Sequence, residues 1–237
     1  MKASSNDNLA VLIDADNAQA SPIHELLEEV SRYGTASVKR AYGDWSTPQL
    51  KKWKEELHTH AIKPVQQFSY TKGKNATDSA LIIDAMDLLH SGDLNGFCLV
   101  SSDSDFTPLA TRIRESGLVV YGFGERKTPQ PFVAACDKFI YTDILKPPET
   151  EGKKTKPRYP SPKKRLVEAV DKATGDDGWA NLGTVGSMLV KNDPSFDSRN
   201  YGYKKLVELV NKQPYLEVRK EKTGSGAGGA NIFVRLK

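Results

Sequence analysis

The stretch Phe97-Cys98-Leu99-Val100-Ser101-Ser102-Asp103-Ser104-Asp105-Phe106 decides the fold that we predict for this chain. Residues 97–100 form an apolar run typical of a short buried strand, and the run stops at small and acidic residues. Apolar residues recur at helical spacing from Phe106 onward, so we expect a helix to begin where the strand ends. Ligands bind at the carboxyl ends of strands in an open α/β sheet, which makes Asp103 and Asp105 candidate site residues. Asp105 alone is also explained as the N-cap of the helix, whereas Asp103 is not.

Strands and helices alternate before and after this stretch. Apolar runs predict the strands, and helical spacing between them predicts connecting helices, of which the strongest covers 77–90. The predicted strands are residues 9–13, 36–42, 61–66, 97–100, 118–123 and 138–141. This alternation with short connections predicts an α/β fold, a doubly wound and mainly parallel sheet with helices on both sides.

A second, smaller module follows a segment that interleaves prolines with Lys and Arg, a composition typical of a stiff, exposed linker. Alternation at strand period near the chain end predicts a hairpin around the Gly-rich residues 223–229. Helices are predicted before it at 164–172, 182–190 and 198–211. Three helices and such a hairpin describe a winged helix. The predicted organisation is a first domain at 1–146, a basic linker at 147–162 and a winged-helix domain at 163–237.

The composition excludes several protein classes. The 237 residues are 38% hydrophobic and 27% charged, which suits a soluble globular protein. No apolar run approaches the roughly 20 residues of a membrane span, and the first residues lack the apolar core of a signal peptide. The two cysteines lie far apart in the sequence, so we expect neither a disulfide framework nor a zinc site, and we predict a cytoplasmic protein.

Charge is divided unevenly along the chain. Residues 1–150 carry 16 Lys and Arg against 20 Asp and Glu, whereas residues 151–237 carry 18 against 10. An acidic first part joined to a basic second part favours chemistry in the one and binding of a polyanion in the other.

Another candidate carboxylate, Asp14, follows the strand predicted at 9–13. In a doubly wound sheet the chain leaves its first strand in one direction and later crosses back to continue on the other side. The strands at 9–13 and 97–100 are then neighbours at this switch point. We therefore expect Asp14 to lie close to Asp103 and Asp105.

Asp78 lies at the start of the helix predicted at 77–90 and precedes its apolar stripe by one turn, so we expect the side chain to point inward at the same sheet edge. Asp84 and Asp87 lie off the stripe and are expected in solvent. An Asp in a first helical turn is ordinarily explained by the helix dipole. Its inward position after a basic loop favours a functional role instead.

Carboxylates gathered without a matching set of Lys or Arg would repel one another strongly. A hard divalent cation with oxygen ligands resolves this repulsion, and such an ion supports phosphodiester hydrolysis. We expect Asn17 to hold a water or a phosphate, and Ser101 and Ser102 to orient the carboxylates. The predicted ligands of Mg²⁺ or Mn²⁺ are Asp14, Asp78, Asp103 and Asp105.

Three motifs resemble the NYN domain family, a branch of the PIN-like nucleases that includes LabA-like proteins. Their order and spacing match over about residues 8–145, and they read Ile13-Asp14-Ala15-Asp16-Asn17, Lys74-Asn75-Ala76-Thr77-Asp78 and Ser101-Ser102-Asp103-Ser104-Asp105-Phe106. The resemblance implies a metal-dependent ribonuclease. Its catalytic residues would be Asp14, Asp78, Asp103 and Asp105, with Asn17 as the early Asn of the family. Ser102 stands where the third motif usually has Gly.

The second module resembles the OST-HTH/LOTUS domain over about residues 160–237. The matching motifs are Gly178-Trp179-Ala180-Asn181-Leu182, Val185-Gly186 and Pro194-Ser195-Phe196-Asp197-Ser198-Arg199-Asn200-Tyr201-Gly202-Tyr203-Lys204-Lys205-Leu206. The resemblance implies a winged helix that binds RNA or, in some members, a protein. We expect Arg199, Lys204 and Lys205 to contact phosphates from the recognition helix, although the same residues also suit a solvated face.

Together these features predict a metal-dependent endoribonuclease acting on RNA, with single-stranded RNA favoured. Lys72 and Lys74, together with Arg40 at the end of the second strand and Ser102, are further expected substrate contacts. One alternative is a non-catalytic adaptor that binds RNA or a protein through the same fold. Another is a haloacid-dehalogenase-type phosphatase, suggested by Asp14-Ala15-Asp16, although the Thr that such a turn requires is missing.

Overall fold

The computed structural model describes residues 7–68, 76–145, 160–222 and 230–237. The chain forms two compact units, Met1–Pro148 and Glu149–Lys237. The predicted linker lies largely outside the described residues, so the predicted domain boundaries at 1–146 and 163–237 stay predictions. Among the described residues, no helix is both long enough and apolar enough to span a bilayer.

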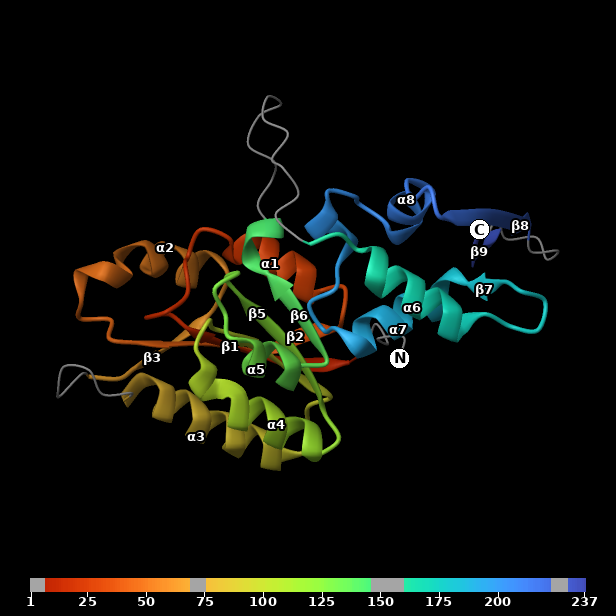
Figure 1. Ribbon diagram of the computed structural model, residues 1–237. Helices are drawn as coiled ribbons and strands as arrows, with labels where there is room; N and C mark the ends of the chain where they lie inside the picture. Colours follow the sequence, from red (N-terminus) through yellow and green to blue (C-terminus); the bar gives the residue numbers. More distant parts are fainter. Residues whose placement is uncertain (1–6, 69–75, 146–159, 223–229) are drawn as a thin grey trace, which may run out of the picture. The chain divides into compact units, whose positions relative to one another are not determined.

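The first unit is built on a six-stranded, entirely parallel sheet with the strand order β3-β2-β1-β4-β5-β6 (Figure 1). Its strands are β1 (Asn8–Asp14), β2 (Thr35–Gly43), β3 (Lys63–Gln66), β4 (Gly96–Val100), β5 (Val119–Gly124) and β6 (Lys138–Tyr141). The predicted doubly wound α/β sheet is confirmed. The chain runs outward from β1 through β2 and β3, then crosses back to β4 on the other side of β1, and this crossover makes β1 and β4 neighbours at the switch point.

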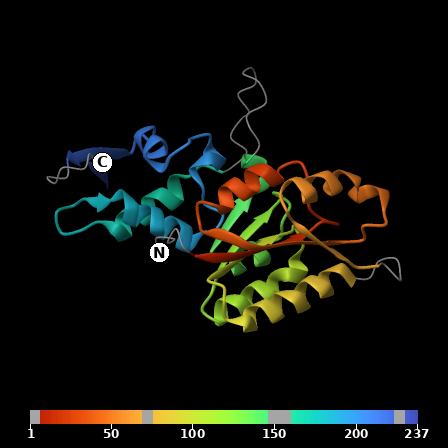
Figure 2. The ribbon, with the colours of Figure 1, turned by 180° about the vertical axis from the view of Figure 1, so that it is seen from behind.

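Helices cover both faces of this sheet (Figures 1 and 2). On one face lie α1 (Ile23–Val30) and α2 (Lys51–Thr59), and on the other lie α3 (Ala76–Ser91), α4 (Thr107–Glu115) and α5 (Gln130–Ala135). Short 3₁₀ turns complete the unit, namely η1 (Pro48–Leu50), η2 (Ser104–Phe106) and η3 (Thr142–Ile144).

Strand β1 shows why the apolar runs are continuous. Val11 and Ile13 pack with α1 and α2 in one core cluster. Successive side chains of a strand point to opposite faces, so Leu12 and Asp14 face the layer that contains α3. All four side chains are fully buried. Burial on both faces explains the apolar run, and the alternation assigns Asp14 to the face from which Asp78 approaches.

The second unit combines helices with a small antiparallel sheet of order β7-β9-β8, which is consistent with a winged helix. Its elements are α6 (Lys163–Ala173), β7 (Ala180–Asn181), α7 (Leu182–Asn192), the turn η4 (Ser198–Tyr201), α8 (Leu206–Asn211), β8 (Leu216–Lys222) and β9 (Ala230–Leu236). The Gly-rich segment 223–229 lies outside the described residues. One core cluster joins these elements, and it includes Phe196 and Tyr201.

The prediction of one continuous helix at 198–211 is wrong. Its first part is the short turn η4, which ends at Gly202, and a regular helix begins only at Leu206. Gly202 has φ of +85°, the left-handed conformation in which glycine commonly ends a helix. The intervening residues therefore lie in a connection and not on a recognition helix.

Candidate metal centre

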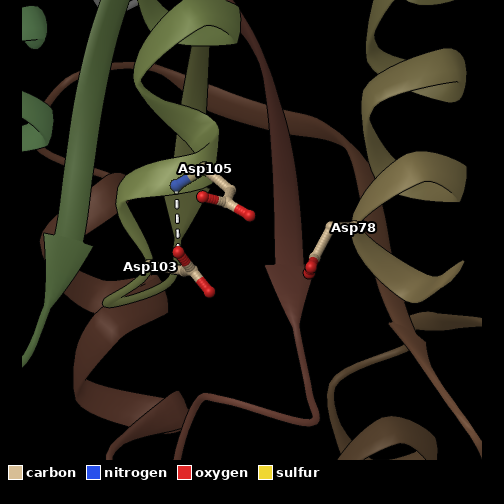
Figure 3. Close-up of side chains that lie close together, drawn as sticks. All are labelled: Asp78, Asp103 and Asp105. Carbon is tan, nitrogen blue, oxygen red and sulfur yellow. Dashed lines mark hydrogen bonds between the residues drawn. The ribbon is translucent and has the colours of Figure 1, made fainter. Parts of the chain in front are cut away.

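Three carboxylates meet at the carboxyl edge of the sheet. Asp78, Asp103 and Asp105 each offer an oxygen atom within 4.8 Å of the other two. Asp78 approaches from the first turn of α3, whereas Asp103 and Asp105 belong to the turn that follows β4 (Figure 3). These residues, which we call the acidic trio, bring together two segments that are 25 positions apart in the sequence.

The turn after β4 fixes the two later carboxylates. Asp103, not Asp105, is the N-cap of η2, since an oxygen of its side chain accepts a hydrogen bond from the backbone N–H of Asp105 at 2.9 Å. This bond uses one carboxylate oxygen of Asp103 and leaves the other for a ligand (Figure 3). Capping and site formation therefore do not compete for the same atom.

Asp78 is 8% exposed and points inward, as its position before the apolar stripe of α3 predicted. The preceding residue, Thr77, donates its hydroxyl proton to Asp16 at 2.8 Å and so fixes the start of α3 against the loop after β1. Burial, together with the negative charges of Asp14, Asp103 and Asp105, raises the pKa of Asp78 to about 6.

Asp14 is the last residue of β1 and is fully buried. Its carboxylate accepts hydrogen bonds from the Ser101 hydroxyl at 2.7 Å and from the Asn17 backbone N–H at 3.3 Å. The Ser101 oxygen in turn accepts the backbone N–H of Asp103 at 3.1 Å. Burial raises the pKa of Asp14, while the hydrogen bonds of Ser101 and Asn17 lower it. Asp14 is thus held beneath the acidic trio and acts on it by its charge.

Three of the four predicted ligands come together in this geometry, and the prediction that Asp14 is a fourth ligand stays a prediction. Only Asp78, Asp103 and Asp105 satisfy the mutual distance that defines the trio, and Asp14 does not. The reason is that Asp14 still belongs to β1, so its side chain is committed to Ser101 and to the interior of the sheet. Its full burial also differs from the accessible carboxylate that a phosphatase nucleophile requires.

The donor set of the trio fits a hard divalent cation. The described charges that raise the pKa of Asp78 are those of four other carboxylates, Asp14, Asp16, Asp103 and Asp105. Carboxylates in this arrangement repel one another unless a cation is bound between them. Mg²⁺ is typically bound by one or two carboxylates with waters and substrate phosphates, and carboxylate and water oxygens also suit Mn²⁺.

Comparison with known proteins agrees with this geometry. Residues 8–145 match the family model of the NYN domain. The chain belongs to the NYN domain family. Residues 157–227 match the OST-HTH/LOTUS domain, which overlaps the second compact unit. No curated protein matches the chain.

Three solved structures resemble parts of the chain. A protein of unknown function from Vibrio parahaemolyticus is 19% identical, with 60% of this chain and 96% of that chain covered and a TM-score of 0.49. An uncharacterized protein from Nitrosomonas europaea is 31% identical over 39% of this chain and 88% of its own, with a TM-score of 0.32. A protein segment from Chromobacterium violaceum is 40% identical over 31% of this chain and 76% of its own, with a TM-score of 0.26.

Arg40 of the NYN domain does not end its strand, and this premise of the prediction is wrong. It lies within β2 and forms an ion pair with Asp84 of α3, with the two side chains 25% and 23% exposed. Asp84 also accepts a hydrogen bond from the hydroxyl of Tyr42, so the prediction of a solvated Asp84 is wrong as well. These contacts bind α3 to β2. The sequence hid them because the partners are more than 40 residues apart.

The remaining predicted substrate contacts differ in their placement. Lys72 and Lys74 lie outside the described residues. Arg199 forms an ion pair with Asp197, which occupies its guanidinium in η4. Lys204 and Lys205 are exposed in the connection before α8 and not on a helix. Their contact with phosphates stays a prediction.

A cleft of about 190 Å³ adjoins the trio at Asp103. Its lining residues are Asn17, Ser102, Asp103, Ser104, Lys127 and Pro129. Sequence reasoning found Asn17, Ser102 and Asp103 but missed Ser104 and Lys127. Lys127 could have been predicted, because it lies just after the end of β5 (Val119–Gly124). Ligands bind at the carboxyl ends of parallel strands, and this applies to β5 as well as to β1 and β4.

Proposed function

We propose that this protein is a metal-dependent endoribonuclease whose NYN domain cleaves RNA and whose OST-HTH/LOTUS domain binds it. The observation that carries the proposal is the acidic trio at the switch point of the sheet. The family supports the same activity, because a PIN-like nuclease fold supplies the site on which such carboxylates act.

In this proposal the residues of the site have separate tasks. Asp78, Asp103 and Asp105 hold Mg²⁺ or Mn²⁺, and Asp14 adds negative charge from below. Ser101 and Asn17 keep the Asp14 carboxylate oriented. When bound, the cation lowers the pKa of an attacking water and stabilises the leaving oxygen of the phosphodiester. Hydrolysis with the 3′ oxygen as the leaving group leaves 5′-phosphate and 3′-hydroxyl ends.

The basic second domain supports RNA as the substrate. Residues 151–237 carry 18 Lys and Arg against 10 Asp and Glu, whereas the NYN domain is acidic. Electrostatic attraction to phosphates supplies most non-specific nucleic-acid affinity. A basic domain joined to an acidic nuclease thus holds a strand near a site that would otherwise repel it. We propose that the substrate is single-stranded RNA, that the protein is soluble and acts in the cytoplasm, and that the LOTUS domain also binds a partner protein.

The test is incubation of the full chain with labelled single-stranded RNA, duplex RNA and DNA, each with Mn²⁺, with Mg²⁺ and with a chelator. We expect cleavage of single-stranded RNA with Mn²⁺ or Mg²⁺ and none with the chelator. Asp103→Asn removes the negative charge of one carboxylate of the trio but keeps the shape of the side chain. We expect it to lower the rate of RNA cleavage by at least about 100-fold.

Asp87→Asn is the matched control, because Asp87 carries the same charge on α3 but is exposed to solvent. This variant should cleave at the wild-type rate. Cleavage by Asp103→Asn as fast as by wild type would refute the site. Isothermal titration with Mn²⁺ distinguishes the adaptor alternative: a wild-type protein that neither cleaves RNA nor binds Mn²⁺ through the trio uses the NYN fold for binding alone.

A further inference from the structure

We infer that the cleft beside Asp103 binds a backbone phosphate adjacent to the scissile one, with Lys127 as its cationic contact. This inference rests on the proposed function, since it assigns the path of the RNA strand away from the acidic trio. The cleft has one carboxylate, Asp103, and one ammonium, Lys127, among its lining residues. A polyanionic strand that enters a negatively charged site needs such a positive contact next to it.

The size of the cleft suits one phosphate and its sugar. Pockets for drug-sized ligands are roughly 300–1,000 Å³, whereas this cleft measures about 190 Å³. Its other polar lining groups are the amide of Asn17 and the hydroxyls of Ser102 and Ser104. The Ser102 oxygen accepts the backbone N–H of Glu125 at 2.8 Å, which leaves its hydroxyl proton available to donate. Donors of this kind match phosphate oxygens and sugar hydroxyls.

The backbone that carries Lys127 is held in place. Thr128 donates both its backbone N–H, at 3.0 Å, and its hydroxyl, at 2.6 Å, to the backbone oxygen of Glu125. Thr128 is buried against Gly124, where a Cβ would lie 2.7 Å from the Thr128 hydroxyl and 2.5 Å from the backbone oxygen of Ser101. This turn is therefore packed onto the end of β4. It keeps the base of the Lys127 side chain at a fixed position beside the cleft.

The present partner of Lys127 is one that a phosphate can replace. Its ammonium lies 3.0 Å from a carboxylate oxygen of Glu125, and the Lys127 side chain is 71% exposed. Exposed ion pairs of this kind contribute little to stability, so breaking this one costs little. Glu125 also accepts a hydrogen bond from the amide of Gln19 at 3.0 Å, so it keeps a partner if Lys127 turns to a phosphate.

The test measures kcat, KM and their salt dependence for a short single-stranded RNA with Mn²⁺. Lys127→Ala should raise KM about tenfold, leave kcat within about twofold, and reduce the slope of log affinity against log salt by about one. Lys127→Arg should retain most of the affinity. Glu125→Gln should lower KM about twofold, because it releases the ammonium. Lys52→Ala, which removes the same charge from an exposed position of α2, is the matched control and should change none of these values.

A KM and salt slope for Lys127→Ala equal to those of Lys52→Ala would overturn the inference while the nuclease function stands. If the wild-type protein does not cleave RNA, the proposed function fails, and fluorescence anisotropy with the same RNA and a chelator then decides the phosphate contact separately. Weaker binding by Lys127→Ala than by Lys52→Ala supports it, and equal binding refutes it.

Discussion

Two aspartates of α3 face the same sheet and meet opposite surroundings. Asp78 lies among other carboxylates, and burial together with their negative charges raises its pKa to about 6. Asp84, six residues later, contacts the guanidinium of Arg40 and the hydroxyl of Tyr42. In the proposed function Asp78 binds a cation from outside the chain, whereas the charge of Asp84 is paired within the chain itself. Asp84 therefore stabilises the fold through its contacts, whereas Asp78 keeps its place despite the repulsion of its neighbours.

The largest expected effect is the loss of RNA cleavage on replacing Asp78, the carboxylate that lies among other carboxylates. Asp78→Asn should lower cleavage of single-stranded RNA by at least about 100-fold, because the trio loses a charged ligand. Circular dichroism should show an unchanged fold, since the amide keeps the shape of the side chain. Cleavage that survives this exchange with Mn²⁺ present would mean that Asp78 and Asp84 do not differ in the way proposed.

Asp84→Asn should have the reverse result. Removing one partner of a largely buried ion pair leaves Arg40 uncompensated, and for side chains about a quarter exposed we expect a loss of about 2–3 kcal/mol in the free energy of unfolding. Urea denaturation measures this loss. The protein that remains folded should still cleave RNA within a few-fold of wild type. A loss of cleavage without a loss of stability would place Asp84 in the chemistry.

The two aspartates also show how far the sequence alone leads. The neighbouring positions of β1 and β4 follow from their apolar runs and from the switch-point rule, and the inward direction of Asp78 follows from helical spacing. The Arg40–Asp84 pair could not be foreseen, because it depends on how α3 lies along β2, which no local pattern encodes. The hydrogen bond that Asp14 accepts from Ser101, 87 residues away, could not be foreseen either. The break at Gly202 was foreseeable, since glycine commonly ends a helix.

A cation that binds Asp78 should stabilise the folded protein. At a free Mn²⁺ concentration of about 100 times Kd, binding to the folded state alone adds about 2.7 kcal/mol. Differential scanning fluorimetry should therefore show a rise in Tm with Mn²⁺ for wild type and for Asp84→Asn. The rise should be small or absent for Asp78→Asn. An equal rise in all three proteins would indicate that Mn²⁺ binds elsewhere.

The smallest expected effect is a gain in stability from losing Asp78 when no metal is present. The folded pKa of about 6 lies above the ordinary 3.8, so the folded state holds its proton more tightly than the unfolded chain does. The ionised carboxylate therefore costs stability, and this cost is absent below pH 3.8, grows between 3.8 and 6, and is complete above 6. With a chelator at pH 7.5, Asp78→Asn should be more stable than wild type by about 1–2 kcal/mol, and the difference should shrink toward pH 4.5. Asp84→Asn should be less stable than wild type at pH 7.5. A pH-independent difference for Asp78→Asn would show that neither burial nor the negative neighbours raise the pKa of this carboxylate, and the proposed contrast between the two aspartates would then fail.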